Sequence, residues 1–173
     1  MNPIRLTLAE INSLSRENFA RVFGGLFEHS PWIADVTWSN QPFANLAQLH
    51  DAFCQTVLNA SEEKQLALIC AHPDLVGRAA LTGQLTREST NEQTSAGLNQ
   101  LTPEEIDRFN QSNAAYREKF GFPFVICARL NKKEAILDGF RLRLNHSREQ
   151  EIKTALEEIF KIAQLRLRDL THD

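Results

Sequence analysis

His72 is the first candidate for chemistry in this 173-residue chain, because it stands in the stretch A-H-P-D-L-V-G-R directly after an alanine- and leucine-rich run. An imidazole titrates near neutral pH and therefore suits proton transfer. Pro73 biases the backbone of His72 towards extended geometry and holds the residue at a junction. Two interpretations stay open. His72 either caps a helix that begins at Pro73, with Asp74 in its first turn, or serves as an acid–base group. The four other histidines lack such a context and are interpreted as surface or capping residues: His29, His50, His146 and His172.

A second polar cluster is R-E-S-T-N-E-Q, residues 87–93. Ser89 and Glu92 have the spacing of a capping box, which predicts a helix that begins here. A helix N-terminus also attracts anions through its free N–H groups and its dipole. Ser89 and Gln93 are therefore candidates to contact a polar ligand, and Glu92 to orient an imidazole or handle a proton.

The last helix predicted, from Ser147 to about Leu170, contains an arginine that points inward. Arg166 falls between Ala163 and Leu170 when residues are placed 100° apart, on the face formed by the apolar side chains of this segment. Arg168 falls on the opposite, charged face. A buried guanidinium needs an anion. That anion is either a carboxylate of the protein, in a structural salt bridge, or a planar anionic ligand.

Composition and motifs exclude several classes of protein. Hydrophobic residues make up 42% of the chain and charged residues 24%, and the net charge is −3 without a basic stripe, so nucleic acid is not an expected partner. No apolar run is long enough to cross a membrane, and the first ten residues lack the apolar block of a signal peptide. The three cysteines, Cys54, Cys70 and Cys127, have no metal-ligand spacing and read as reduced thiols of a cytoplasmic protein. Phosphate-loop and nucleophile-elbow motifs are also missing, so we expect acid–base chemistry without a metal or organic cofactor.

The pattern along the chain predicts an all-α fold in a single compact multi-helix domain, residues 1–173. Thr7 with Glu10 opens a first helix, and Thr102-Pro103 opens another that ends at Gly121. Further helices are predicted from Ser15 to the proline at position 31, and over residues 45–59 and 61–70.

Only G-F-P-F-V-I-C-A-R, residues 121–129, has the composition of a strand. A single strand has no partner to pair with, so we expect a buried extended loop. Its backbone N–H groups must then find other acceptors.

Four stretches together resemble the 2-oxo-4-hydroxy-4-carboxy-5-ureidoimidazoline (OHCU) decarboxylases of urate degradation. They are F-G-G-L-F-E-H-S-P-W-I-A (23–34), A-H-P-D-L-V-G-R-A-A (71–80), L-T-R-E-S-T-N-E-Q-T-S-A-G-L (85–98) and F-N-Q-S-N-A-A-Y-R-E-K-F-G-F-P-F-V-I-C-A-R (109–129). The resemblance extends from about Phe19 to the last helix. Ala71 stands where the family often has proline.

The resemblance implies a cofactor-free carboxy-lyase that is all-helical and a homodimer, and that converts the small molecule OHCU to S-allantoin. The family's catalytic histidine falls on His72 and its glutamate on Glu92. Its substrate-binding positions fall on Pro73, Ser89, Thr90, Asn91, Glu92, Gln93, Phe124, Val125, Ile126, Cys127, Ala128 and Arg166. Two rival interpretations are a non-catalytic helical interaction domain and a different cofactor-free lyase or hydrolase acting on a related purine metabolite.

Overall fold

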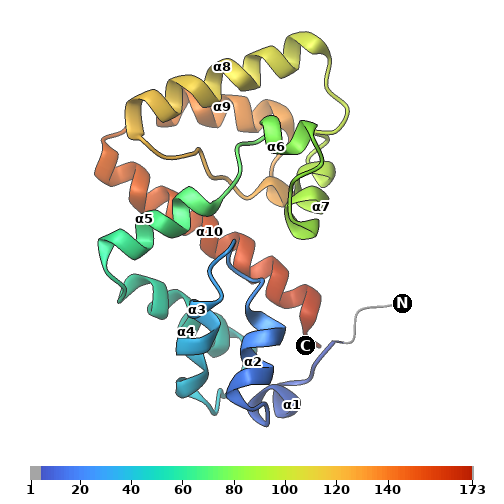
Figure 1. The fold of residues 1–173 in the computed structure, drawn as a ribbon, viewed down its shortest axis with the longest axis vertical. Helices are drawn as coiled ribbons and strands as arrows, with labels where there is room; N and C mark the ends of the chain where they lie inside the picture. The colour runs from blue at the N-terminus through green and yellow to red at the C-terminus, as the bar shows by residue number, and fades with distance from the viewer. Residues whose placement is uncertain (1–4, 173) are drawn as a thin grey trace. The chain divides into compact units, whose positions relative to one another are not determined.

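The structure, a computed structural model, describes residues 5–172 and is helical (Figure 1). Within this range the only extended pairing is an isolated bridge between Leu6 and Thr171. The all-α prediction is therefore confirmed. No helix in the described range is long and apolar enough to cross a bilayer. The first four residues, which belong to the stretch judged not to be a signal peptide, lie outside the described part of the chain.

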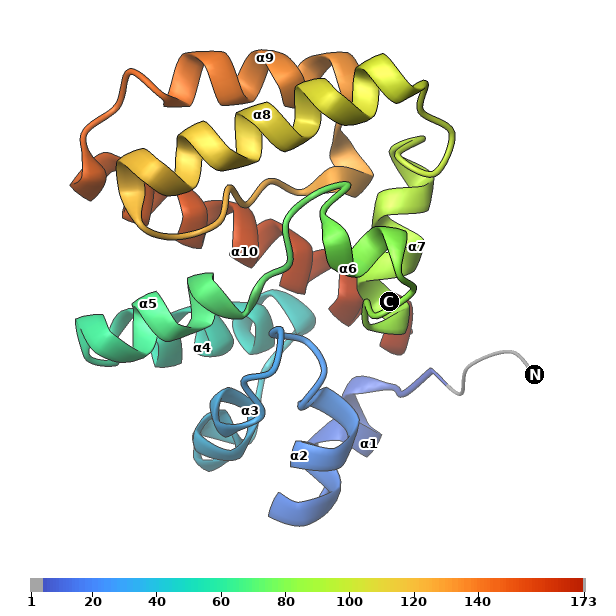
Figure 2. The same cartoon turned by 45° about the horizontal axis from the view of Figure 1, so that its top comes forward.

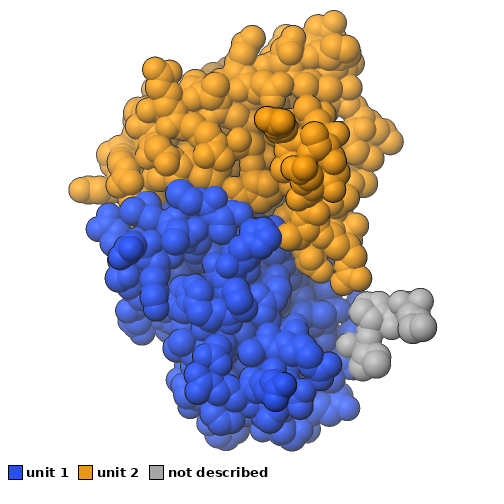
Figure 3. Space-filling model, in the orientation of Figure 1, with its two compact units in different colours: residues 1–71, 160–173 blue, residues 72–159 orange. Residues whose placement is uncertain are grey.

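The chain forms two compact units, coloured separately in Figure 3. Unit 1 comprises the described residues up to Ala71 and from Phe160 onward, and unit 2 comprises His72–Ile159. Helix α10 (Arg148–Leu170) begins in unit 2 and ends in unit 1. That residues 1–173 act as a single domain stays a prediction.

Unit 1 is built around a cluster of phenylalanines. It contains α1 (Leu8–Asn12), α2 (Arg16–Phe23), α3 (Trp32–Thr37), the short 3₁₀ helix η1 (Trp38–Asn40), α4 (Leu46–Leu58), α5 (Glu62–Ala71) and the end of α10. The ring of Phe19 lies 4.7 Å from that of Phe23 and 5.9 Å from that of Phe53, centroid to centroid. The capping box predicted at Thr7 and Glu10 is present.

Helix α2 ends earlier than the sequence predicts. It stops at Phe23 instead of continuing to the proline at position 31, because the pair Gly24-Gly25 follows and glycine is a poor helix former. Phe27 is nevertheless buried, so the apolar periodicity identified a core residue although it misplaced the helix end. Helix α3, of only six residues, is not among the predicted helices.

Unit 2 contains α6 (Arg78–Leu81), α7 (Arg87–Ser95), α8 (Pro103–Phe120), the 3₁₀ helix η2 (Ala128–Leu130), α9 (Lys133–Arg143) and the start of α10. Helices α8 and α9 run side by side (Figures 1 and 2). The start of α8 is the predicted capping box at Thr102, and its end is Gly121 at φ 79°, a left-handed conformation that glycine adopts without strain. Helix α9 was missed, although Ile136, Phe140 and Arg143 are buried at helical spacing.

A fully buried carboxylate joins three elements of unit 2. Glu151, on α10, has no exposed surface. One oxygen, Oε2, accepts hydrogen bonds from the Tyr116 hydroxyl and from the Arg143 guanidinium, the latter at 2.9 Å, and Oε1 lies 2.7 Å from His146 Nδ1. Burial, and then the bond to Glu151, raise the pKa of Tyr116, so its hydroxyl stays protonated and donates. The interpretation of His146 as a surface or capping residue is thus incomplete.

Replacing Glu151 by alanine should reduce the free energy of unfolding by about 3–5 kcal/mol, because the Arg143 charge would remain buried without its carboxylate. Urea denaturation followed by circular dichroism measures this change. The matched control is Glu157→Ala on the exposed face of the same helix, with an expected change of less than about 1 kcal/mol. Equal effects of the two substitutions would contradict the importance of the buried pair.

Candidate active site

His72 is the first residue of unit 2 and is buried, with 7% of its surface exposed. The residues that follow it, 73–77, form a loop, and the next helix, α6, begins only at Arg78. The interpretation of His72 as the cap of a helix starting at Pro73 is therefore wrong. Val76 in this loop has φ 55°, a left-handed conformation that is strained for a β-branched side chain.

Three side chains from neighbouring helices hold this strained loop. Arg117 Nε on α8 donates to both carboxylate oxygens of Asp74, at 3.0 and 3.1 Å. Asn113, one turn earlier on α8, donates from Nδ2 to the carbonyl oxygen of Leu75 at 2.8 Å. The N–H of Val76 donates to Gln93 Oε1 on α7 at 3.0 Å. Three consecutive loop residues are thus each fixed by a different side chain.

Helix α7 presents only part of the predicted motif to the interior. Its N-cap is Thr86, whose hydroxyl accepts from the N–H of Ser89 at 3.2 Å, so the prediction of Ser89 as the capping residue is wrong. Ser89 and Gln93, four residues apart on one face, are buried, and Glu92 beside them is half-buried. Thr90 and Asn91 are exposed.

The loop predicted over residues 121–129 is confirmed for residues 123–127, whereas Ala128 and Arg129 begin η2, and two backbone groups of the loop are paired with side chains. Residues 123–127 have no regular secondary structure and all except Ile126 are buried. The carbonyl oxygen of Val125 accepts from Arg143 Nη1 at 2.7 Å, and the N–H of Cys127 donates to Glu158 Oε2 at 2.8 Å. The ring of Phe124 stacks on that of Phe140 at 3.8 Å.

Helix α7 connects the two loops. Gln93 bonds to the loop after His72, while α7 also packs against η2, which directly follows the 123–127 loop. Burial raises the pKa of the Cys127 thiol, and the negative charges of Glu158 and Glu92 raise it further. Unit 2 therefore gathers the residues following His72, the buried face of α7 and the extended loop.

Arg166 lies in unit 1 and is buried, as the helical count predicts. Its Nη1 and Nη2 both lie 3.1 Å from Oε2 of the buried Glu28, and Nη1 also donates to the carbonyl oxygen of Gly25 at 3.2 Å. The guanidinium thus has the protein carboxylate that the structural interpretation of Arg166 requires. Its predicted contact with substrate stays a prediction.

Several of these contacts come from residues that the sequence analysis did not single out. They are Glu28, Asn113, Arg117, Arg143, Glu151 and Glu158. A signal existed for the two acids of α10: Glu151, Ala155, Glu158 and Ile162 follow one another at steps of three or four residues, and all four are buried. The partners of the loops have no such signal, because their contacts join residues far apart in the sequence.

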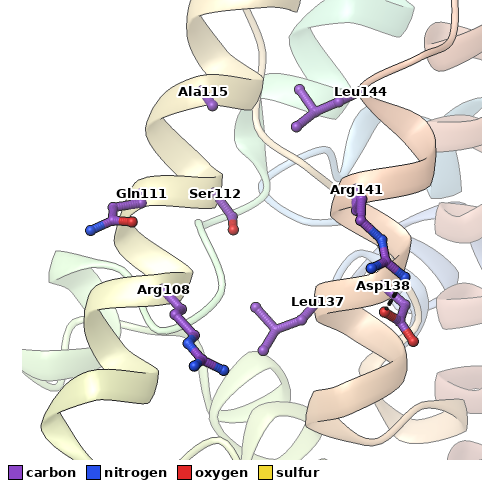
Figure 4. Close-up of a pocket in the computed structure, with 8 residues that line it drawn as sticks. All are labelled: Arg108, Gln111, Ser112, Ala115, Leu137, Asp138, Arg141 and Leu144. Carbon is purple, nitrogen blue, oxygen red and sulfur yellow. Dashed lines mark hydrogen bonds and ion pairs between the residues drawn. The ribbon is translucent and has the colours of Figure 1, made fainter.

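A groove of about 390 Å³ lies elsewhere on unit 2, between α8 and α9 (Figure 4). Its lining includes Arg108 and Ser112 from α8, and Leu137 and Arg141 from α9. Arg141 is bound to Asp138 at the groove, 2.9 Å away. None of the predicted site residues lines it, so we do not assign the chemistry to this groove. Within residues 5–172, no three histidine, cysteine or acidic side chains are grouped to hold a metal ion.

Comparison with known proteins identifies the family of the chain. The sequence model of one protein family, described as OHCU decarboxylase, matches residues 12–168. A 2-oxo-4-hydroxy-4-carboxy-5-ureidoimidazoline decarboxylase from Halalkalicoccus jeotgali is 43% identical over 96% of this chain and 93% of the relative. A decarboxylase of the same name from Amia calva is 44% identical over 95% of this chain and 94% of the relative. The crystal structure of an (S)-allantoin synthase superposes with a TM-score of 0.78 at 31% identity, over 96% of this chain, which spans about half (54%) of that protein's chain.

The environments of the cysteines predict their reactivity. Burial, and then the charge of Asp51, raise the pKa of Cys54 to about 12, and burial with Glu158 raises that of Cys127, whereas Cys70 is exposed. Since the thiolate is the reactive form, iodoacetamide at pH 8 should alkylate Cys70 at least about tenfold faster than the other two. Peptide mass spectrometry over time measures the three rates. Rapid alkylation of Cys127 would show that the extended loop opens readily and would contradict its burial.

Proposed function

The chain belongs to the OHCU decarboxylase family and is a decarboxylase, and on this premise we propose that it converts OHCU to S-allantoin in urate degradation, with His72 and Glu92 as its catalytic pair. The observation that carries the assignment of His72 is its buried place at the head of a loop fixed by three side chains. As in the expectation from sequence, the proposed enzyme uses no metal or organic cofactor, acts in the cytoplasm and forms a homodimer.

The reaction requires charge stabilisation and a proton transfer to one face of a carbon. The substrate carries its carboxylate and a hydroxyl group on ring carbon C4, beside C5, which bears the ureido group and is double-bonded to a ring nitrogen. When the bond to the carboxylate breaks, carbon dioxide leaves, the bonding electron pair forms a C4=C5 double bond, and the pair of the former C5=N bond moves to the ring nitrogen, which takes up a proton. The enol at C4 then becomes the carbonyl of allantoin as its hydroxyl proton is lost and a proton is added to C5 from one face. His72 supplies this proton, after first engaging the hydroxyl or carboxyl group, and Glu92 holds the imidazole.

Gln93 is suited to bind a carbonyl oxygen of the substrate. Its Oε1 accepts from the N–H of Val76, which fixes the orientation of the amide. The Nε2 group is consequently left as a donor for the substrate. Ser89, on the same buried face, adds a hydroxyl group that contacts the ring or ureido group. Thr90 and Asn91 are exposed and stay predictions from the resemblance alone.

The extended loop supplies the donors for the developing oxyanion. Successive residues of an extended chain point their N–H and C=O groups to opposite sides. The carbonyl oxygen of Val125 accepts from Arg143, and the N–H of Cys127 donates to Glu158, so this N–H is already occupied. By this alternation the N–H group of Ile126 points to the other side, and we assign the oxyanion to it, together with the N–H group of Ala128 at the start of η2. Pro73, Phe124 and Val125 provide apolar surface, which disfavours the charged carboxylate and favours its loss.

Replacing His72 by asparagine should reduce turnover about 10²–10⁴-fold, because the proton donor is lost. The measurement is circular dichroism during the decay of freshly generated OHCU, which reports both the rate and the chirality of the allantoin formed. Wild type should give one enantiomer rapidly. Slow formation of racemate, unchanged by wild-type protein, would refute the proposed function.

The matched control for this substitution is His172→Asn at an exposed position, which should leave both rate and chirality unchanged. Near-normal turnover by His72→Asn, with a helical spectrum like that of wild type, would remove His72 from the mechanism while leaving the reaction itself in place.

Arg166 is assigned to the substrate's anionic groups, and two substitutions separate this role from its salt bridge. Arg166→Met should lower kcat/KM about 10–100-fold, because a hydrogen bond to a charged group is lost. Glu28→Gln removes the carboxylate but keeps the guanidinium. It should reduce the melting temperature while changing kcat/KM less than about threefold. Equal losses of kcat/KM in both variants would show that Arg166 acts only through its pairing with Glu28.

A further inference from the structure

Asn113 stands out in unit 2 because its side chain is only half satisfied. It is 6% exposed, and its Nδ2 donates to the carbonyl oxygen of Leu75 at 2.8 Å. Its Oδ1 is the one buried side-chain oxygen or nitrogen in the described range that has no hydrogen-bond partner. Exchanging the two ends of the amide would place oxygen against oxygen at Leu75, so the orientation is fixed by that bond.

A buried acceptor without a partner opposes folding, and an apolar side chain of similar size would avoid this cost. The amide therefore contributes little to stability for its own sake. What it provides is a donor at one place, the carbonyl of Leu75, three residues after His72. This carbonyl precedes Val76, whose φ of 55° is strained and needs support from its surroundings.

We propose that Asn113 is a positioning residue: through its bond to Leu75 it keeps the loop after His72 in the strained conformation that aims the imidazole for proton transfer. This inference rests on the proposed function of His72. Asn113 itself touches neither the substrate nor the reacting atoms.

Three side chains hold the loop, and a comparison of their contacts shows why Asn113 has the greatest effect on the loop's conformation. Arg117 binds the side chain of Asp74, and both groups are partly exposed to water, so their ion pair is weakened by solvent. Gln93 holds the N–H of Val76 but also faces the proposed substrate. Asn113 is buried and binds only a backbone atom of the loop, the carbonyl oxygen of Leu75. Leu75 lies between Asp74 and Val76, the residues that the other two side chains hold.

The first test compares Asn113→Leu with wild type in the OHCU assay. A displaced catalytic group costs on the order of 10–100-fold in rate, so kcat should fall by about that factor while KM changes less than about threefold. The matched control is Asn12→Leu in unit 1. Asn12 also holds a loop backbone through its amide, donating to the carbonyl oxygen and accepting from the N–H of Phe43, both at 2.8 Å. That variant should lose stability but keep kcat.

The second test uses Asn113→Asp, which answers the question within one protein even when the leucine variant does not fold. A protonated aspartate donates to the Leu75 carbonyl, whereas an ionised one repels it, and burial raises the pKa of this carboxyl. The ratio of kcat in the variant to kcat in wild type should therefore rise at least about tenfold as the pH is lowered through that pKa. A flat ratio, or a kcat of Asn113→Leu within twofold of wild type, would overturn the proposal.

A readout without substrate separates this inference from the proposed function. The NMR signals of the His72 ring, assigned by their loss in His72→Asn, should shift in Asn113→Leu and in Asn113→Asp at high pH, but not in Asn12→Leu. If wild type does not accelerate OHCU decay, the proposed function fails, and these signals alone decide the inference. Unchanged His72 signals in both Asn113 variants would refute it.

Discussion

Two irregular segments carry part of the candidate site, and both depend on the same constraint: a buried backbone N–H or carbonyl group must be paired. Neither segment has a strand or helix to supply its partners. The loop after His72 obtains them from Asn113 and Gln93, and the extended loop obtains them from Arg143 and Glu158. Side chains thus replace the regular hydrogen bonding of secondary structure, and each of them fixes a chosen atom of the loop.

The charged side chains that hold the extended loop must themselves be neutralised. Glu158 and Arg143 can serve the extended loop only when their own charges are tolerated inside the protein. Arg143 is neutralised by Glu151, which is further bound to Tyr116 and His146. In unit 1, Arg166 is neutralised in the same manner by Glu28. Helix α10 therefore carries both acidic and basic groups on buried positions, and the cost of burying each is offset by a partner from another element.

The arrangement also explains how one helix can serve two loops. Helix α7 is short and polar, with few apolar side chains to anchor it. Its buried face consists of Ser89 and Gln93, and Gln93 uses its oxygen for the loop, which leaves its amide nitrogen as a donor. We propose that structural and substrate-binding roles are in this way divided between the two ends of a single side chain. A glutamate at this position could not make the same division, because a carboxylate has no donor.

The sequence by itself determined what depends on local periodicity and on residue chemistry. Helical spacing predicted the all-α fold, most long helices, the capping boxes at Thr7 and Thr102, and the burial of Arg166. The lack of a second strand predicted an unpaired extended loop over residues 121–129, and the structure has it at residues 123–127. The resemblance in motifs indicated the family. The end of α2 at Phe23 follows a local signal, the pair Gly24-Gly25, that the predicted helix ran past. Only the tertiary structure decided which side chains hold the loops and that Thr86 and not Ser89 caps α7. These outcomes depend on contacts between residues 17 to 43 positions apart within unit 2, or on competition between neighbouring caps, and no local pattern encodes them.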